Sequence, residues 1–459
     1  MAAVPPARRS RPSIWWWELT YRIGPNLGVI PFLMAFVAVL AFAATRRLDA
    51  VVGRPGPDEV LPLPEWLLAR TPADADVVLS AFLGALSAAL ALVFSTTVLT
   101  FSLASTQLGP RLIRRFMQDP VTQVTLGLFL SAVVLCALTL GSVRTGAGSA
   151  GVPIVSYALA MTAGLSCFFM LVVYIHRVAV TIQAPTVVAS VVEALDRSLD
   201  EQQRPVAGVR PCGDAALVAG TVAQAAATGG VIVAPTTGFI QVVDHLRLVD
   251  AAEREGAVIV LEHRVGQFVV EGRPMARVLP ARAARAIEAS THHAVEIGPS
   301  RTRRQDTEYA IYQVVEIALR ALSPAVNDTF TGMTCVDWLG AALCRLGTQP
   351  APTGGLQGPS GTLHLYEPPL RFDRALPASF DLIRQSGAAN PAITIRLLDA
   401  VAVMATVVRP EYLGYLRSEA GQVLATALAT APVGRDAEDI RRRHGRTIAA
   451  IDDRLQAER

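Results

Sequence analysis

The chain has 459 residues, 52% of them hydrophobic, and a mean hydropathy of +0.40. This is too apolar for an ordinary soluble protein and too polar for a chain that lies in the membrane throughout, so we expect a membrane part and a non-membrane part. The net charge of +3 gives no support for a nucleic-acid partner.

All 41 basic residues are arginine, because the sequence contains no lysine. A Schiff base with pyridoxal phosphate, a P-loop lysine and side-chain attachment of biotin or lipoate are therefore excluded. The five cysteines form no CxxC pair, which argues against a disulfide framework or a zinc site. We expect no cofactor and no metal site.

Four segments are long and apolar enough to cross a hydrocarbon core of about 30 Å as helices. None of them contains Asp, Glu or Arg, and Trp15, Trp16 and Trp17 precede the first one, where an interfacial anchor belongs. The expected spans are residues 27–45, 77–103, 121–143 and 154–175.

Arginines in the flanking segments predict the orientation of these spans. Eight lie on one side and five on the other, which favours a multi-pass protein of the inner (plasma) membrane with both termini in the cytoplasm. Ionisable groups at mid-membrane, which proton pumps and ion-coupled transporters usually keep, are missing from all four expected spans. Coupled transport is therefore disfavoured, whereas a passive conduit is not.

The second span carries a stripe of small and hydroxyl residues on one helical face of about 100°. Such a stripe either packs against another helix or lines a water-filled path through an oligomer, with Ser95, Ser102 and Thr106 as candidate path-lining residues. Arg111, Arg114 and Arg115 follow the span, either as lipid contacts or as a positive mouth for anions. The stripe consists of Gly84, Ser87, Ala88, Ala91, Ser95, Ser102, Ser105 and Thr106.

The sequence pattern changes after a connecting helix expected at residues 185–204. Short β-rich runs predict strands at 231–234, 238–243 and 258–262, with a helix at 245–255 between the last two. Residues 266–278 alternate around two glycines, which predicts a β-hairpin. Residues 205–280 are therefore expected to form a small α+β or barrel-like unit.

Helical periodicity returns in residues 281–296, 306–322 and 329–346. Pro324 ends the second of these helices, and Asn327 or Asp328 can cap the third. This corner is either a structural turn or a small polar cluster that binds an ion or anion at a helix start. Its candidate residues are Ser323, Pro324, Asn327, Asp328, Thr329 and Thr331.

Residues 350–361 have the composition of a flexible linker. Helices are expected beyond it at 379–386, 392–408, 413–429 and 434–456. The segment 392–408 is apolar but contains Arg396 and Asp399, which predicts a buried helix or an interface and not a fifth span.

The expected fold class is thus a membrane α-helical part with four transmembrane helices, followed by a mixed α+β, mainly helical soluble domain with a small β-unit. The expected parts are a cytoplasmic or interfacial segment (1–25), the transmembrane domain (26–178), a connecting helix (179–204), the β-unit (205–280), a helical region with the corner (281–349), the linker (350–361) and a C-terminal helical region (362–459).

Three separated segments resemble a known family: FSLASTQLGPRLIRRF, YIHRVAVTIQ and ALRALSPAVNDTFTGMTCVDWL. The sequence is similar to the bacterial family of predicted membrane proteins catalogued as domain of unknown function 2254. Thr329 stands where the family pattern has proline. The resemblance covers most of the chain and implies the architecture without implying a reaction.

Three functions remain open. The first is a homo-oligomeric, channel-like conduit with a cytoplasmic vestibule or gate that passes a small ion or ligand. The second is a membrane-anchored ligand-binding or scaffold protein whose partners are the lipid bilayer and other copies of the chain. A membrane enzyme ranks last, because no nucleophile elbow, HExxH or P-loop is present.

Overall fold

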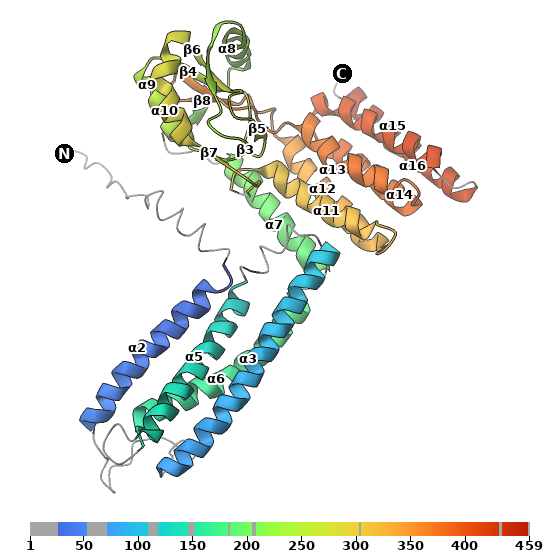
Figure 1. The fold of residues 1–459 in the computed structure, drawn as a ribbon. Helices are drawn as coiled ribbons and strands as arrows, with labels where there is room; N and C mark the ends of the chain where they lie inside the picture. Colours follow the sequence, from blue (N-terminus) through green and yellow to red (C-terminus); the bar gives the residue numbers. More distant parts are fainter. Residues whose placement is uncertain are drawn as a thin grey trace, which may run out of the picture. The chain divides into compact units, whose positions relative to one another are not determined.

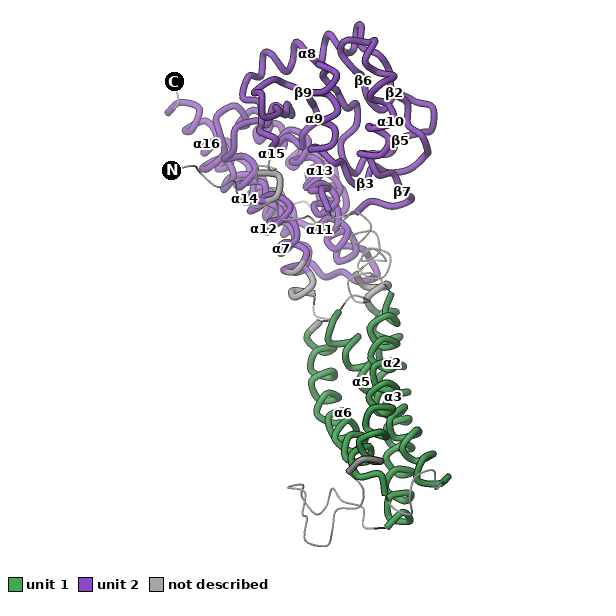
Figure 2. Tube along the Cα trace, turned by 90° about the vertical axis from the view of Figure 1, so that its left-hand side faces the viewer, with its two compact units in different colours: residues 1–183 green, residues 184–459 purple. Residues whose placement is uncertain are grey.

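The computed structural model describes residues 26–52, 71–108, 117, 119–145, 152–181, 184–203, 208–302, 304–430 and 434–457. The chain divides into two compact units, which Figure 2 colours separately. Unit 1 spans residues 1–183 and unit 2 spans residues 184–459.

Unit 1 is a bundle of four long helices (Figure 1). Its helices are α2 (Val29–Val52), α3 (Pro72–Leu108), α5 (Pro120–Arg144) and α6 (Ile154–Thr181). Each contains a stretch long and apolar enough to cross a membrane. The four predicted spans are therefore confirmed as helices of the right length and composition.

Helix α5 is the centre of the bundle, since it packs against α2, α3 and α6. Its side chains Phe129, Ala132 and Cys136 are fully buried. Two glycines permit close approach between helices: a Cβ at Gly127 would collide with Met34 of α2, and a Cβ at Gly164 of α6 would collide with Phe82 of α3. Small residues at such contacts are how helices pack tightly in lipid.

Charged groups lie at the end of the bundle where α2 and α5 finish and α3 and α6 begin. Where α6 begins, Asp49 of α2 accepts hydrogen bonds from the Val155 N–H (2.8 Å) and the Ser156 hydroxyl (2.6 Å). Arg144, the last residue of α5, pairs with Asp76 of α3 at 2.5 Å. The 25 residues of α5 rise by about 37 Å, enough to cross a hydrocarbon core of about 30 Å.

Unit 2 is mainly helical. The predicted helices are present with bounds within a few residues, except that α13 begins seven residues before the predicted 379, and α8 was not predicted. They are α7 (Ala184–Gln203), α8 (Ala215–Thr228), α9 (His245–Arg254), the short η2 (Ala281–Ala283), α10 (Ala284–Ala294), α11 (Thr307–Ala321), α12 (Thr329–Thr348), α13 (Phe372–Ser386), α14 (Pro391–Val407), η3 (Pro410–Tyr412), α15 (Leu413–Thr430) and α16 (Arg435–Ala457).

Two small sheets complete unit 2. A six-stranded sheet has the order β1-β8-β9-β4-β6-β2, and a three-stranded sheet has the order β5-β3-β7. The strands are β1 (Arg210–Pro211), β2 (Gly230–Val233), β3 (Gly238–Val243), β4 (Val258–Leu261), β5 (Phe268–Val269), β6 (Pro274–Leu279), β7 (Val295–Gly298), β8 (Gly355–Gln357) and β9 (Leu363–Tyr366).

The predicted hairpin of residues 266–278 is wrong. Strands β5 and β6 belong to different sheets: β5 pairs with β3, while β6 lies between β2 and β4. The Gly266 N–H donates to the Ile240 carbonyl, and the Ile240 N–H donates to the Gln267 carbonyl. These bonds join the first arm of the expected hairpin to β3 and so separate it from β6.

The β-structure also draws on residues beyond 205–280. Strand β8 lies inside the segment 350–361 that was expected to be a linker, and it pairs with β9 and β1. Strand β9 then runs parallel to β4. The main sheet therefore joins segments separated by about 100 residues, with α11 and α12 between them in the chain.

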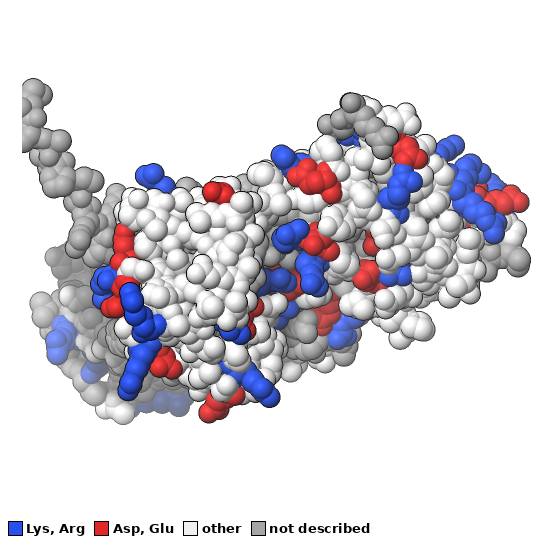
Figure 3. Space-filling view, turned by 90° about the horizontal axis from the view of Figure 1, so that it is seen from above, with Lys and Arg blue, Asp and Glu red and all other residues white. Residues whose placement is uncertain are grey.

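Positive and negative charges are mixed on one face of the molecule. On the face drawn in Figure 3, arginine and acidic side chains are interspersed and separated by broad uncharged areas. Helix α8 contains no charged residue, and only its Val218 and Ala225 are buried.

A buried ion pair joins the three-stranded sheet to α11. Asp306, 1% exposed, accepts hydrogen bonds from Arg301 at 2.7 and 2.8 Å and caps α11 by accepting from the Tyr309 N–H at 2.9 Å. A Cβ at Gly266 would overlap the Asp306 carboxylate. The loop before β5 can therefore reach α11 only with glycine at this position.

Replacing Asp306 by alanine should lower the free energy of unfolding of unit 2 by about 3 kcal/mol, because α11 would lose its cap and the buried Arg301 would keep only Glu308, at 3.2 Å, as an acidic partner. Asp214→Ala is the matched control: Asp214 caps α8 from an exposed position, so its loss should cost only about 1 kcal/mol. Denaturant unfolding of the two variants in detergent, followed by circular dichroism, measures the difference. Equal losses would contradict the role given to the ion pair.

Candidate functional site

The small-residue stripe of α3 faces away from the bundle. All six of its residues whose side chains the structure describes are exposed, and a Cβ added at Gly84 would meet nothing within 4 Å. The core-facing side chains of α3 lie on the opposite side, about 180° around the helix. They are Ala75, Leu79, Leu86, Val93, Thr97 and Thr100.

The structure describes the side chains of only some of the candidate path-lining residues. Ser95 and Ser102 lie on this outward face, in α3. The side chains of Ser105 and Thr106, like residues Arg111, Arg114 and Arg115, lie outside what the structure describes. The predicted positive mouth therefore stays a prediction.

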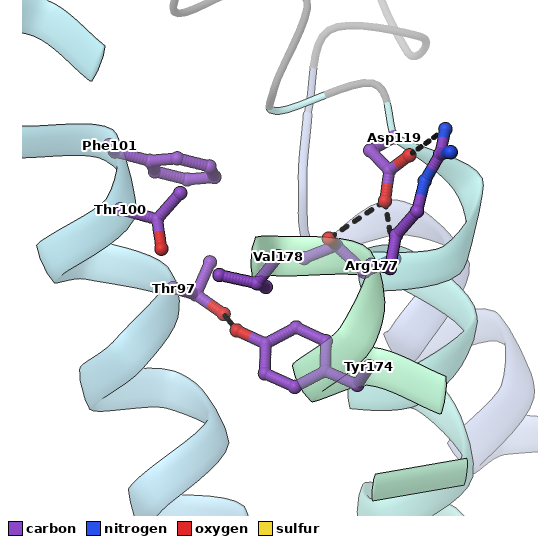
Figure 4. Close-up of a pocket in the computed structure, with 8 residues that line it drawn as sticks. Thr97, Thr100, Phe101, Asp119, Tyr174, Arg177 and Val178 are labelled. Atoms are coloured by element: carbon purple, nitrogen blue, oxygen red, sulfur yellow. Dashed lines mark hydrogen bonds and ion pairs between the residues drawn. The ribbon is translucent and has the colours of Figure 1, made fainter. Parts of the chain in front are cut away.

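Hydroxyl groups on the inward side of α3 form a cluster that the sequence did not predict. Tyr174 of α6 is buried, and its hydroxyl lies 2.6 Å from the Thr97 hydroxyl and 3.2 Å from the Thr96 hydroxyl. The Val93 carbonyl accepts from both groups, at 2.7 Å from the Thr97 hydroxyl and at 3.2 Å from the Tyr174 hydroxyl, so either hydroxyl can be the donor in the bond between them. This bond joins α3 to α6 (Figure 4).

An ion pair lies at the same end of the bundle. Asp119 caps α5 by accepting from the N–H and the hydroxyl of Thr122, both at 2.9 Å, and it pairs with Arg177 of α6 at 3.4 Å (Figure 4). Asp119 therefore fixes the start of α5 against the end of α6.

These groups line a small cavity between α3, α5 and α6. Its volume is about 20 Å³, which is about the space that one water molecule needs. The lining is Thr97, Thr100, Phe101, Asp119, Thr122, Tyr174, Arg177 and Val178. This cavity therefore has room for about one bridging water.

The predicted polar corner of unit 2 is a tight turn whose polar atoms bond mostly to one another. Asp328 caps α12: it accepts from the N–H of Thr331 at 3.0 Å and from its hydroxyl at 2.5 Å. These bonds hold the pKa of Asp328 below its usual range. The Ser323 hydroxyl donates to the Arg320 carbonyl at 2.7 Å, and Asn327 has a positive φ of 51°.

The corner also connects to the next turn of the fold. The side-chain amide of Asn390 donates to the Thr329 hydroxyl at 2.8 Å, while Pro324 and Asn327 are exposed. The six corner residues are thus close in space, and the contacts described serve the turn and the cap. Within the described part of the chain, no three His, Cys, Asp or Glu side chains are placed to hold a metal ion.

The comparison with protein families decides the membership of the chain. Residues 25–403 match the model of the family described as "Predicted membrane protein (DUF2254)". The chain belongs to this family. The family description agrees with four apolar helices in unit 1, and it places the protein in a membrane.

Similar sequences occur in mycobacteria. Uncharacterized proteins of Mycobacterium bovis and Mycobacterium tuberculosis are 27% identical to this chain over 358 residues, which is 73% of the chain and 64% of each relative. The match thus spans less than two thirds of the length of these relatives. No solved structure matches the chain.

Removing the Tyr174 hydroxyl should loosen the contact between α3 and α6. Tyr174→Phe is expected to lower the stability of the bundle by about 1 kcal/mol, the usual size of a side-chain hydrogen bond between membrane helices. Ser166→Ala is the control, because the Ser166 hydroxyl donates to the Thr162 carbonyl of its own helix at 2.8 Å and so joins no second helix among the described residues. Unfolding in mixed micelles measures both, and equal effects would contradict the assignment.

Proposed function

We propose that this protein is a homo-oligomeric membrane conduit in which the outward faces of α3 from several copies meet and line the path. The observation that carries the proposal is the direction of the small-residue stripe, which points away from the core of its own bundle. We place the assembly in the inner (plasma) membrane with both termini in the cytoplasm, so that unit 2 serves as a vestibule or gate.

Small residues favour contact with another helix at this face. In lipid, apolar side chains gain nothing by leaving the solvent, so helices associate where small residues let their backbones approach. Gly84 and Ala88, and likewise Ser87, Ala91 and Ser95, follow one another at four-residue intervals on the exposed side of α3. A second copy of α3 is the partner with a matching surface.

We propose that the path runs between subunits and not through the bundle of a single subunit. The interior of the bundle is filled around α5, and the cavity beside Tyr174 has room for about one water molecule. On the outward face, Ser87, Ser95 and Ser102 place hydroxyls at steps of about 11 Å along about 22 Å of helix. Hydroxyl groups at such spacing can wet the wall of a narrow conduit.

The charge distribution favours passive passage. The described charged residues of the spans, such as Asp76, Asp119, Arg144 and Arg177, belong to the two ends of the bundle. A coupled transporter would need ionisable groups nearer mid-membrane.

A membrane-anchored ligand-binding or scaffold protein is the second candidate. It is supported by the closed interior of the bundle, and it requires the α3 faces to join copies without forming a wet path. The two candidates share the oligomer and differ in conductance.

The oligomer is tested by enlarging the stripe. Gly84→Leu combined with Ala88→Leu should prevent the α3 faces from meeting and should reduce the particle mass in mild detergent to that of one chain. Light scattering after size-exclusion chromatography measures this mass. Ala43→Leu, at an exposed position of α2, should leave it unchanged. A wild-type monomer would refute the proposal.

The conduit is tested by current through planar bilayers. Ser95→Leu should reduce single-channel conductance at least about tenfold, because a leucine ring would dewet a narrow path. The control is Thr162→Leu, a hydroxyl lost from an exposed position of α6. Unchanged conductance in Ser95→Leu would exclude this path. A silent but oligomeric wild type would favour the scaffold.

A further inference from the structure

The α11–α12 corner presents an unusually apolar tip. Phe330 is 79% exposed, comparable to Phe169 (77%) on the outer face of the membrane helix α6. Val326 is 48% exposed, and Pro324 and Ala325 are exposed beside it. The only charge in residues 323–330 is that of Asp328, which is engaged as the cap of α12.

A second uncharged turn lies next to this tip. Residues 386–392, between α13 and α14, contain no charged side chain, and Asn390 bonds to Thr329 at 2.8 Å. A Cβ at Gly332 of α12 would touch both Leu322 and Ile393, so the two turns pack closely. Together they form a pair of uncharged turns that joins α11 to α12 and α13 to α14.

This pair of turns lies level with the beginning of α7. The Ser198 hydroxyl of α7 lies 2.6 Å from that of Thr307, at the start of α11. Arg345, near the end of α12, binds Asp196 and Asp200 of α7. From Thr307, α11 extends about 21 Å to the corner. From Ser198 back to Ala184, α7 covers the same length.

Chain connectivity keeps the beginning of α7 near the end of α6. Ala184 begins α7 three residues after Thr181 ends α6, so the two residues are at most about 11 Å apart, whatever the orientation of unit 2. The end of unit 2 that is tethered to the last membrane helix is thus also the end that exposes Phe330 and Val326.

We propose that the α11–α12 corner is a contact with the lipid surface, in which Phe330 and Val326 enter the boundary between headgroups and acyl chains. Apolar side chains held on a rigid, uncharged turn fit that layer, which excludes unpaired charge and accepts aromatic rings. The contact anchors unit 2 to the bilayer at a second point besides α7. This inference depends only on membrane insertion and is independent of the conduit.

The test places a fluorescent reporter at the corner. Phe330→Cys is labelled with an environment-sensitive dye in a Cys344→Ser background, since Cys136, Cys167, Cys212 and Cys335 are buried. The full chain is reconstituted in phosphatidylcholine–phosphatidylglycerol vesicles with or without brominated acyl chains. A label at a depth of about 5–10 Å should lose about half of its fluorescence to the bromine atoms.

Val403→Cys is the matched control. Val403 is an apolar side chain of α14 that is 59% exposed and lies about 18 Å along that helix from the uncharged turns. It should show no quenching, while Val326→Cys should repeat the result of Phe330→Cys. Absent quenching at both corner positions would overturn the proposal, as would equal quenching at Val403. If two unlabelled Phe330→Cys chains cross-link to each other and the labelled variant shows no quenching, the corner is a contact between copies instead.

Discussion

The structure of unit 1 depends on keeping charge out of the middle of the bundle. A charged side chain at the centre of a bilayer costs about 2.5–3.5 kcal/mol even on insertion scales. The charges are used at the ends instead: Asp49 binds the first turn of α6, Asp119 caps α5 and pairs with Arg177, and Arg144 pairs with Asp76. The groups that mark the membrane boundary therefore also fix how the helices align.

Within this constraint, α3 has two faces with different roles. Inward, Thr97 bonds to Tyr174 and so joins two helices; outward, Gly84 and Ser95 are exposed. The sequence predicts that the small residues share one face, because that follows from helical periodicity. It cannot predict which way the face points, or that Thr97 meets a tyrosine 77 residues later, since both depend on packing.

The fold was predictable where local pattern decides it. Hydropathy defines the four spans, and apolar periodicity defines α11 and α12. The prediction from sequence failed where segments far apart in the chain determine the structure. Strand β5 joins β3 because Gly266 bonds to Ile240 and packs on Asp306, and β8 exists only because β9 and β1 pair with it. Helix α8 is rich in alanine and lacks the polar side that makes an amphipathic pattern visible.

The glycines of the bundle differ in their surroundings: some pack against a neighbouring helix that the structure describes, and Gly84 does not. A glycine within a helix costs roughly 0.5–1 kcal/mol relative to alanine, so it needs a reason. Gly127 and Gly164 have one, because Met34 and Phe82 occupy the space of a side chain. Gly84 has no such neighbour among the residues that the structure describes: it is exposed, and a Cβ there would meet nothing within 4 Å. Ala88 and Ala91 continue the same face, and the second copy of α3 that we propose as its partner would account for all three small residues.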